Sequence, residues 1–236
     1  MDIAEPLISF DAEKTALEAR EFMLDHGIDV IGVRKNGSTV GFALVEELKE
    51  GTCGDYLSHW LQTTILEETT SLRDAIQSLS HSEHCFISVL GEISAIVSRG
   101  HIQKPPVRMW LFGMISILEM FFTEKIQEMY PDDTWKNKIS AARRHKAEQL
   151  LQERLRRRQY SELIDCLQLS DKARILIKNP GMRAEFGFKS IREADRGIKN
   201  LESLRNNLAH AQDIVSYNWE TILTISNRLD TIVSRI

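Results

Sequence analysis

The chain has 236 residues, which is enough for one large domain or two smaller ones. Hydrophobic residues make up 42% of it and charged residues 27%, so the chain can bury a core and is not a disordered tail. Its 3 cysteines exclude a disulfide scaffold and a zinc site built from four thiolates. Cysteines in this small, odd number indicate a reducing compartment.

The net charge of −4 is divided unevenly along the chain. Residues 1–104 contain 8 Lys and Arg against 17 Asp and Glu, a balance of −9. Residues 105–236 contain 22 against 17, a balance of +5. An acidic segment repels polyanions, whereas a mildly basic one can approach them. The two parts are therefore expected to have different partners.

No membrane span or signal peptide is expected. The most apolar run, residues 109–122, has 14 residues and contains Glu119. A bilayer span needs about 20 apolar residues without an acid near the middle, so this run is predicted to be a buried helix. The acidic N-terminus lacks the basic start and apolar stretch of a signal peptide. The sequence predicts a soluble, cytoplasmic protein.

A helix, a hairpin and the start of a second helix are predicted in the first part of the chain. Residues 15–25 carry apolar side chains on one side, as an amphipathic helix does. Apolar runs at 28–33 and 39–44 flank Asn36-Gly37. Asn-Gly between such runs is a strong hairpin signal, because both residues tolerate the positive φ of a type I′ turn. Residues 45–48 would then begin the second helix.

The same order of elements recurs between residues 71 and 102. Ser71, with an aspartate three residues on, resembles a helix N-cap and predicts a helix through Leu79. Two strands are predicted at 85–90 and 93–97, around Gly91-Glu92, and 98–102 would start another helix. A helix–strand–strand–helix unit of about 45 to 60 residues therefore occurs twice, and an internal repeat is stronger evidence than local propensity.

Two segments carry a family resemblance. Gly41–Leu48 and Ala95–Ile102 resemble the two strand-to-helix signatures of a CBS-domain pair, and the resemblance covers residues 1–104. It implies an α+β fold that binds an adenine nucleotide in a cleft between the repeats. A CBS pair that serves only as a dimerisation scaffold is the other interpretation.

The resemblance also implies the residues of the ligand site. In CBS domains a hydroxyl residue and an aspartate three residues further on usually hold the phosphate and the ribose. Ser98 matches the hydroxyl position, whereas Leu44 does not. Glu47 and His101 stand where the family often has aspartate, and an imidazole does not accept paired ribose hydroxyls as a carboxylate does. Glu47, Ser98 and His101 are the candidate ligand-binding residues.

From Lys104-Pro105-Pro106 onward the sequence is predicted to be helical, because two prolines end one element and Pro106 can open the next. Predicted helices cover residues 109–127, 135–158, 161–178, about 190–215 and about 217–234. Pro180-Gly181 is a stop signal after the third helix, and Ser190 with Glu193 fits the capping box of the fourth. The expected fold of residues 105–236 is an all-α bundle of four to five antiparallel helices.

Near the end of the fourth predicted helix, Arg205, Asn206 and His210 combine a fixed cation, an amide and a titratable imidazole. Asn206 and His210 share a helix face, and Arg205 lies about 140° from His210. Arginine forms paired hydrogen bonds with phosphate, and histidine transfers protons near neutral pH. This set suits RNA cleavage by the neighbouring 2′-hydroxyl, without a metal. The alternative is a structural role, in which both basic side chains only stabilise the negative end of the helix.

The segment resembles the R-x4-6-H motif of HEPN ribonuclease domains, with a polar residue directly after the arginine, and the predicted bundle matches that family's architecture. The resemblance implies a homodimer in which two copies of the motif face each other across one cleft. In that arrangement Arg205 binds the scissile phosphate, His210 acts as general base or acid, and Asn206 positions a phosphate oxygen or His210 itself.

Glu119 is the fourth candidate catalytic residue, and it lies among apolar neighbours. A buried carboxylate needs a partner, so an ion pair with Arg205 or His210 is predicted. HEPN domains often have an acid on their first helix. The alternative is an exposed acid on an imperfectly apolar helix.

Two basic clusters, Arg143–Lys146 and Arg154–Arg158, could follow a phosphate backbone. A solvated helix face is the other interpretation of these charges. His81, His84 and Cys85 have side chains that ligate metals, but no tetrahedral set accompanies them, so no metal site is predicted.

The sequence as a whole predicts a CBS pair joined to a HEPN-like bundle. The first functional hypothesis is a homodimeric, metal-independent endoribonuclease that leaves 2′,3′-cyclic phosphate ends and is regulated by AMP, ADP or ATP. The second is a non-catalytic nucleotide-sensing protein whose bundle serves dimerisation or partner docking. The third is a nuclease restrained by a cognate antitoxin.

Overall fold

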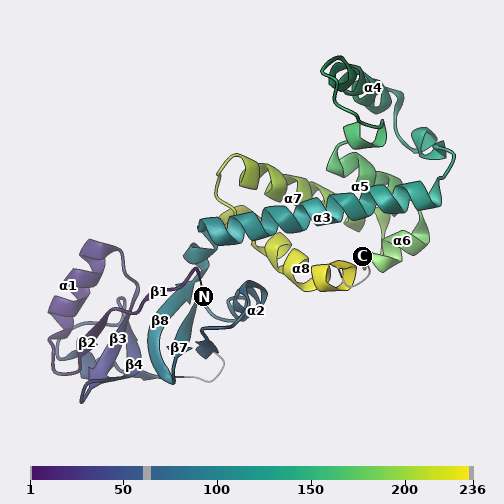
Figure 1. The fold of residues 1–236 in the computed structure, drawn as a ribbon. Helices are drawn as coiled ribbons and strands as arrows, with labels where there is room; N and C mark the ends of the chain where they lie inside the picture. The colour runs from purple at the N-terminus through teal and green to yellow at the C-terminus, as the bar shows by residue number, and fades with distance from the viewer. Residues whose placement is uncertain (1, 61–64, 234–236) are drawn as a thin grey trace. The chain divides into compact units, whose positions relative to one another are not determined.

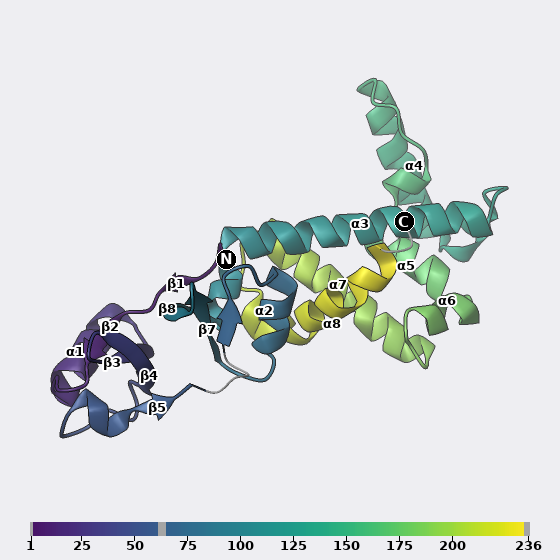
Figure 2. The same ribbon diagram turned by 60° about the horizontal axis from the view of Figure 1, so that its bottom comes forward.

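The computed structural model describes residues 2–60 and 65–233, and the chain divides into two compact units, Met1–Val107 and Arg108–Ile236 (Figures 1 and 2). The first unit is built on β-sheets, and the second is helical.

Two four-stranded sheets form the N-terminal unit, in the orders β2-β3-β4-β5 and β1-β8-β7-β6. The strands are β1 (Glu5–Pro6), β2 (Ser9–Asp11), β3 (Val30–Lys35), β4 (Ser38–Leu44), β5 (Ser58–His59), β6 (Ile65–Glu67), β7 (His84–Val89) and β8 (Glu92–Ser98). The helices are α1 (Ala16–His26) and α2 (Leu72–Ser78), with 3-10 turns η1 (Cys53–Tyr56) and η3 (Arg99–Gln103).

The two repeats of this unit have the same topology. In the first, β2 is parallel to β3 and β3 is antiparallel to β4. In the second, β6 is parallel to β7 and β7 is antiparallel to β8. A parallel pair needs a crossover, and α1 or α2 supplies it. The predicted repeat is therefore confirmed, with one further short strand before each helix.

Both hairpins turn through two residues with positive φ. Asn36 and Gly37 have φ of 52° and 85°, as the Asn-Gly signal predicts. In the second repeat Leu90 and Gly91 have φ of 53° and 87°. The turn therefore falls on Leu90-Gly91 and not on Gly91-Glu92 as predicted, because Glu92 already pairs with Val89.

The segments that follow the hairpins are shorter than the helices predicted there. Residues 45–47 form a turn, in which the backbone N–H of Glu47 donates to the carbonyl of Leu44. The second segment is the single 3-10 turn η3. Gly51 and Lys104-Pro105, which follow closely, leave room for no more than one or two turns.

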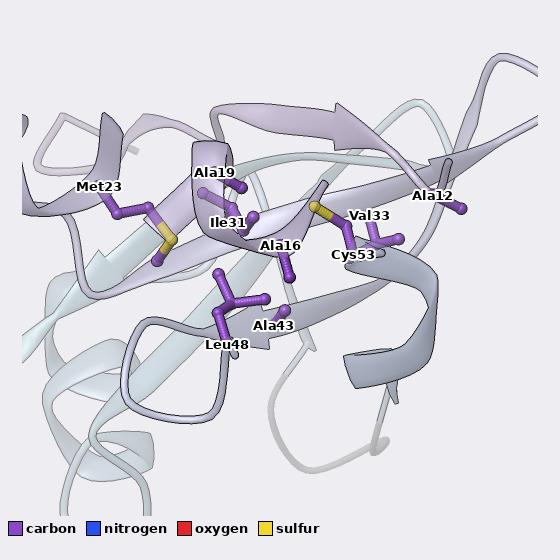
Figure 3. Packing of buried hydrophobic residues seen from close by; sticks show 9 residues of the cluster. All are labelled: Ala12, Ala16, Ala19, Met23, Ile31, Val33, Ala43, Leu48 and Cys53. Carbon is purple, nitrogen blue, oxygen red and sulfur yellow. The ribbon is translucent and has the colours of Figure 1, made fainter. Parts of the chain in front are cut away.

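The core of the first repeat lies between α1 and its sheet (Figure 3). Ala16, Ala19 and Met23 recur at steps of three and four on one face of α1, and all three are fully buried. They pack with Ile31 and with the other members of the cluster. The other members are Ala12, Val33, Ala43, Leu48 and Cys53. Small side chains on α1 let the helix approach the sheet closely.

The C-terminal unit contains six α-helices among the residues that the structure describes, one more than the upper bound of the prediction. They are α3 (Pro105–Met129), α4 (Ala141–Arg156), α5 (Leu169–Ile177), α6 (Pro180–Glu185), α7 (Ile191–Ala209) and α8 (Val215–Val233). Two 3-10 turns, η4 (Thr134–Lys138) and η5 (Ile164–Cys166), separate α3, α4 and α5. Within this unit α4 extends away from the other helices (Figures 1 and 2).

Two predicted helix starts were wrong. The predicted helix 135–158 is broken at Ser140, whose Oγ accepts the N–H of Arg143 and starts α4. The predicted helix 161–178 begins only at Leu169, after η5. The predicted stop after Lys178 is confirmed, because α5 ends at Ile177. Asn179 then caps the short helix α6, which was not predicted and in which proline fits the first turn.

Helix α7 begins as predicted. Ser190 Oγ accepts the N–H of Glu193 at 3.1 Å, and Glu193 Oε2 accepts the N–H of Lys189 at 2.9 Å. The apolar positions of the helix are buried at steps of three and four. They are Ala194, Ile198, Leu201, Leu204 and Leu208.

Helix α3 is less buried than predicted. It is the only helix in the described part of the chain that is long and apolar enough to cross a membrane, and 33% of its most apolar window is buried. Leu111, Ile115 and Leu118 face the interior, whereas Met109 and Met120 are 75% and 62% exposed. The helix therefore has a buried face and an exposed apolar face.

Candidate functional site

The candidate catalytic residues lie at the C-terminal end of α7. Leu204 and Leu208 are buried, and Arg205, Asn206 and His210 are exposed between and beyond them. Arg205 Nη1 donates to Asn206 Oδ1 at 3.4 Å. No described acidic side chain forms an ion pair with Arg205 or His210. The motif thus presents a cation, an amide and an imidazole to solvent from one helix end.

The backbone at this end is closed by a Schellman motif. His210 is the C-cap, and Ala211 adopts the left-handed conformation with φ of 53°. The N–H of Gln212 donates to the carbonyl of Asn207 at 2.9 Å, and the N–H of Ala211 to that of Leu208 at 3.4 Å. The motif side chains are therefore held on a defined backbone. A left-handed alanine costs about 1 kcal/mol relative to glycine.

Arg108 of α3 binds the same helix end. Its Nη2 donates to the carbonyls of Asn207 at 2.8 Å and Leu208 at 3.2 Å, and its Nη1 donates to the carbonyl of Gln212 at 2.9 Å. These carbonyls carry the partial negative charge of the helix terminus. Because a guanidinium neutralises them, the end of α7 can accept a polyanion that a bare helix C-terminus would repel. No motif in the sequence marks Arg108, which lies about a hundred residues from Arg205.

A partly buried amide network ties the motif helix to α8. Asn207 Nδ2 donates to Asn218 Oδ1 at 2.7 Å, and Asn218 Nδ2 donates to Ser203 Oγ at 3.4 Å. Asn218 is only 3% exposed. Buried polar groups hold a unique geometry when they bond one another, so this network fixes the rotation of α7 against α8.

The predicted ion pair between Glu119 and the motif is wrong. Lys172 Nζ of α5 lies 3.0 Å from Glu119 Oε1, and the two side chains are 5% and 35% exposed. Glu119 lies 11 residues beyond Arg108, which is three turns and about 16 Å along α3. The carboxylate therefore lies on the same side of the helix as Arg108 but too far along it to reach the end of α7.

Glu119 and Lys172 line a cavity of about 440 Å³ that is separate from the motif. Its other lining residues are Ser116, Met120, Thr123, Glu124 and Asp165. A buried ammonium needs a carboxylate partner, so the structure gives Glu119 the role of counter-ion to Lys172.

Most of the basic residues on the α4 arm are bound within the unit. Arg143 donates to Gln168 and Asp171, and Arg154 donates to Ser161 and the carbonyl of Asp165. Two further ion pairs lie along the arm, Arg144 with Glu148 and Arg157 with Glu153. Four arginines in and beside α4 therefore have partners within the unit.

In the N-terminal unit Ser98 and His101 form a capping box on η3. Ser98 Oγ accepts the backbone N–H of His101, and His101 Nδ1 accepts the backbone N–H of Ser98 at 3.2 Å. Because Nδ1 accepts a hydrogen bond, the proton of the neutral ring is on Nε2, which lies 3.3 Å from Glu5 Oε2. Both ring nitrogens are thus occupied by neighbours.

Glu5 is shared between His101 and Lys104. Lys104 Nζ lies 2.7 Å from Glu5 Oε1 and donates to the carbonyl of Ile3 at 2.8 Å. The bond from Lys104 is the main cause that lowers the pKa of Glu5. Burial lowers the pKa of His101, and Lys104 lowers it further, whereas Glu5 opposes both. His101 is therefore favoured in its neutral form, bonded to an ionised Glu5.

The first repeat does not match the second at the predicted residues. Glu47 is exposed on the turn after β4, and its backbone N–H donates to the carbonyl of Leu44. In the first repeat the capping box that corresponds to Ser98–His101 is formed by Thr52 and Asp55. Asp55 Oδ2 accepts hydrogen bonds from the N–H of Thr52 at 2.8 Å and from the Thr52 hydroxyl at 2.9 Å. The Thr-x-x-Asp spacing of residues 52–55 is the sequence signal for this capping box.

Among the described residues, no group of three His, Cys, Asp or Glu side chains could hold a metal ion. The three cysteines are free and buried. Burial raises the pKa of the Cys85 thiol to about 11, so this thiol is unreactive in the folded unit.

No family model and no curated protein matches the chain. Solved structures are similar to its N-terminal part. Staphylococcus aureus OpuCA has 14% identity over 43% of this chain and 93% of that chain, with a TM-score of 0.37. CBSX2 from Arabidopsis thaliana, a CBS-pair protein, has 15% identity over 43% and 88%, with a TM-score of 0.36. CBSX2 was also solved in complex with AMP.

The CBS domain of the bacterial CNNM/CorC family Mg²⁺ transporter is a further similar structure. It has 14% identity over 45% of this chain and 73% of that chain, with a TM-score of 0.37. These neighbours are CBS-domain structures and cover the N-terminal part of the chain alone.

Proposed function

We propose that the C-terminal unit is a metal-independent endoribonuclease whose site is Arg205, Asn206 and His210. The observation that carries the proposal is that all three side chains are exposed on one helix end whose carbonyls Arg108 has already bound. The balance of +5 in residues 105–236 supports the approach of a polyanion.

The chemistry follows from the three side chains. The Arg205 guanidinium binds two oxygens of the scissile phosphate. His210 removes the proton of the neighbouring 2′-hydroxyl, whose oxygen attacks phosphorus and displaces the 5′-oxygen of the next nucleotide, and this leaving oxygen takes a proton from water. The products are a 2′,3′-cyclic phosphate and a 5′-hydroxyl end. Asn206 holds a phosphate oxygen or orients the imidazole.

The experiment uses the full chain with end-labelled RNA in excess EDTA, and mass spectrometry of the products. Arg205→Ala and His210→Ala are each expected to lower cleavage at least about 1000-fold. Both side chains are exposed, so the melting temperature should change by no more than a few degrees. Arg192→Ala, an exposed arginine at the other end of α7, is the matched control and should cleave like wild type.

Two outcomes contradict the proposal. One is a wild-type protein that cleaves no RNA in a complex pool, with or without adenine nucleotides. The other is cleavage that Arg205→Ala and His210→Ala leave intact, which would place the activity elsewhere or in a contaminant.

The regulatory part of the proposal is that the N-terminal unit binds an adenine nucleotide near Ser98. Ser98 Oγ caps η3, and Lys104, which pairs with Glu5, is the nearby cation that a phosphate would share with that carboxylate. AMP, ADP and ATP are compared by thermal shift, with AMP first because CBSX2 was solved with it. A ligand at 100 times its Kd stabilises its unit by about 2.7 kcal/mol.

A non-catalytic nucleotide sensor is the second candidate function, and the exposed apolar face of α3 favours it. Such a face is typical of docking. Both candidate functions give a thermal shift with the nucleotide. They differ in the RNA products, because a non-catalytic sensor makes no 2′,3′-cyclic phosphate ends.

A further inference from the structure

A second cavity of the C-terminal unit, here called the Arg174 cavity, gathers basic side chains from η4, α4 and α5. Its volume is about 420 Å³, and the start of α7 forms its remaining wall. The charged residues of its lining are four basic and two acidic side chains, Lys138, Arg143, Arg174 and Lys178 against Asp171 and Asp195. The lining therefore carries a net charge of +2, and an anion is its electrostatic complement.

The two arginines have donors left for a ligand. In the part of the chain that the structure describes, Arg143 donates to Gln168 and Asp171 through Nη1. Arg174 Nε lies 3.8 Å from Asp195 Oδ1, which is beyond hydrogen-bond distance. A guanidinium has five N–H donors in a planar fork, so the Nη2 group of each arginine can donate to an oxyanion.

The two lysines also keep donors. Lys178 Nζ donates to the backbone carbonyl of Lys138, and Lys138 Nζ lies 5.8 Å from the centre of the Tyr130 ring. An ammonium has three donors, so one carbonyl or one ring does not use them all. The four cations therefore supply both charge and hydrogen bonds to the cavity.

The first turn of α4 adds backbone donors to these cations. Ser140 Oγ accepts the N–H of Arg143 at 3.3 Å, and Ser140 lies in the cavity wall. The N–H groups of Ala141 and Ala142 precede that bond and have no partner within the helix. Their partial positive charge has the same sign as the surrounding side chains, and this combination is suited to a phosphate.

The rest of the lining is suited to a nucleotide that carries the phosphate. Three isoleucines, Ile139, Ile177 and Ile191, offer apolar surface to a base or a sugar ring. Sites for small molecules usually have about 300 to 1,000 Å³, so the cavity is large enough for such a group. A terminal phosphate carries about two negative charges at neutral pH. This value matches the charge of the lining better than the single charge of a phosphodiester within a strand.

The Arg174 cavity and the Arg205 motif lie on the same side of α7. Asp195, in the cavity wall, precedes Asn206 by 11 residues. This separation is about 16 Å along the helix and about 20° around it. Stacked nucleotides are spaced by about 3.4 Å, so a strand that starts in the cavity reaches the motif after about five nucleotides.

We propose that the Arg174 cavity binds the phosphorylated end of an RNA strand whose scissile phosphate lies at Arg205. The inference rests on the proposed ribonuclease function and names its substrate class, which is RNA with a terminal monophosphate. Arg143, Arg174 and the two lysines bind the phosphate, and the isoleucines contact the terminal nucleotide.

The test measures binding of the full wild-type chain to short 2′-O-methyl RNA by fluorescence anisotropy. This RNA has no free 2′-hydroxyl, so it is not cleaved by the proposed route. Strands with a 5′-phosphate, with a 3′-phosphate and with hydroxyls at both ends are compared. One of the two phosphorylated strands is expected to bind at least about tenfold more tightly than the hydroxyl strand, because charge-assisted hydrogen bonds are gained. The arm that shows the gain identifies the end that is bound.

Two variants place the preference in the cavity. Arg174→Gln and Lys138→Gln should each lower the preference for the phosphorylated strand at least about threefold. Arg156→Gln, an exposed arginine near the end of α4, is the matched control and should keep the wild-type preference. Melting temperatures confirm folding, and Lys138 is exposed, so at least this variant should fold like wild type.

Three results overturn the inference. They are equal affinities of all three strands, a preference that both variants keep, and a phosphoserine peptide that binds the cavity as tightly as the phosphorylated RNA. The last result would identify a phosphoprotein as the occupant. None of these measurements needs cleavage, so they fail or succeed separately from the nuclease assay.

Discussion

The two candidate sites differ in how their polar groups are satisfied. In the N-terminal unit Ser98, His101, Glu5 and Lys104 bind one another, so every group has a protein partner. At the end of α7 Arg205, Asn206 and His210 are exposed, and the one long hydrogen bond that the structure describes among them joins Arg205 to Asn206, while Arg108 binds the backbone beneath them.

The difference shows what each site requires of a ligand. A nucleotide near Ser98 must replace existing hydrogen bonds and an ion pair, so its net affinity is lowered by what it displaces. A phosphate at Arg205 would compete with one long hydrogen bond to Asn206 and with no ion pair of the described residues. The first arrangement suits a regulatory site that responds to concentration, and the second suits a site that acts on whichever polyanion reaches it.

Among the changes that test the difference between the two sites, Arg108→Ala is expected to have the largest effect on stability and affinity. Three hydrogen bonds from a charged donor are lost, and the carbonyls at the end of α7 regain their negative potential. The C-terminal unit should lose about 2 kcal/mol, measured by urea denaturation, and RNA affinity should fall as well. Arg108→Lys keeps the charge without the fork and should restore part of the affinity. Unchanged RNA binding in Arg108→Ala would remove the residue from the site.

The next effect tests whether the occupied N-terminal site limits nucleotide binding. The double variant Glu5→Gln with His101→Asp provides a carboxylate at the position where the CBS resemblance expects an aspartate, and it removes the like charge that would face it. Adenine nucleotide affinity, measured by calorimetry, is expected to rise about tenfold, equal to 1.4 kcal/mol. His101→Asp alone should gain less, because Glu5 repels the new carboxylate. Equal affinities in the wild type and the double variant would show that this ring does not face the ligand.

The stability of the N-terminal unit is expected to fall when the pH is lowered from 7.5 to 5.5. Burial lowers the pKa of both His84 and His101. Below the ordinary histidine pKa of about 6.5 the unfolded chain binds protons that the folded unit does not, so stability is present above that pH and is lost as it falls. The lowered pKa of Glu5 changes the stability only below a pH of about 4.5, which is outside this range.

The buried cysteines provide the measurement for each unit separately. Labelling of Cys53 and Cys85 reports opening of the N-terminal unit, and labelling of Cys166 reports opening of the C-terminal unit. Labelling of Cys85 should accelerate at low pH more than that of Cys166, after correction for the thiolate fraction. His101→Gln, which keeps the two hydrogen bonds without the titration, should reduce the difference.

The smallest effect is expected at Ala211. Its φ of 53° favours glycine, so Ala211→Gly should stabilise the C-terminal unit by about 0.5–1 kcal/mol, as measured by its urea midpoint. Ala209→Gly, two residues earlier inside α7, is the opposite control and should destabilise the unit by a similar amount. Destabilisation by both changes would mean that the end of α7 does not hold the Schellman geometry in solution.

Local signals predicted the elements that depend on local chemistry. The turn at Asn36-Gly37 and the helix starts at Ser71 and Ser190 were right, because a turn or a cap is decided by residues within four positions. The break at Ser140 is also a cap, but it lies inside a long polar run in which the helical pattern continues on both sides. Pattern alone therefore joined η4 and α4 into one predicted helix.

The amino-acid sequence by itself determined the duplicated α+β part, the helical part that follows it, and the grouping of Arg205, Asn206 and His210 on one helix end. Helical and strand periodicities need only neighbouring residues. Tertiary structure alone decided that Arg108 binds the end of α7, that Lys172 takes Glu119, and that Glu5 meets His101. These partners are separated by 53 to about 100 residues, so their meeting depends on how elements pack and on which buried charge must be neutralised.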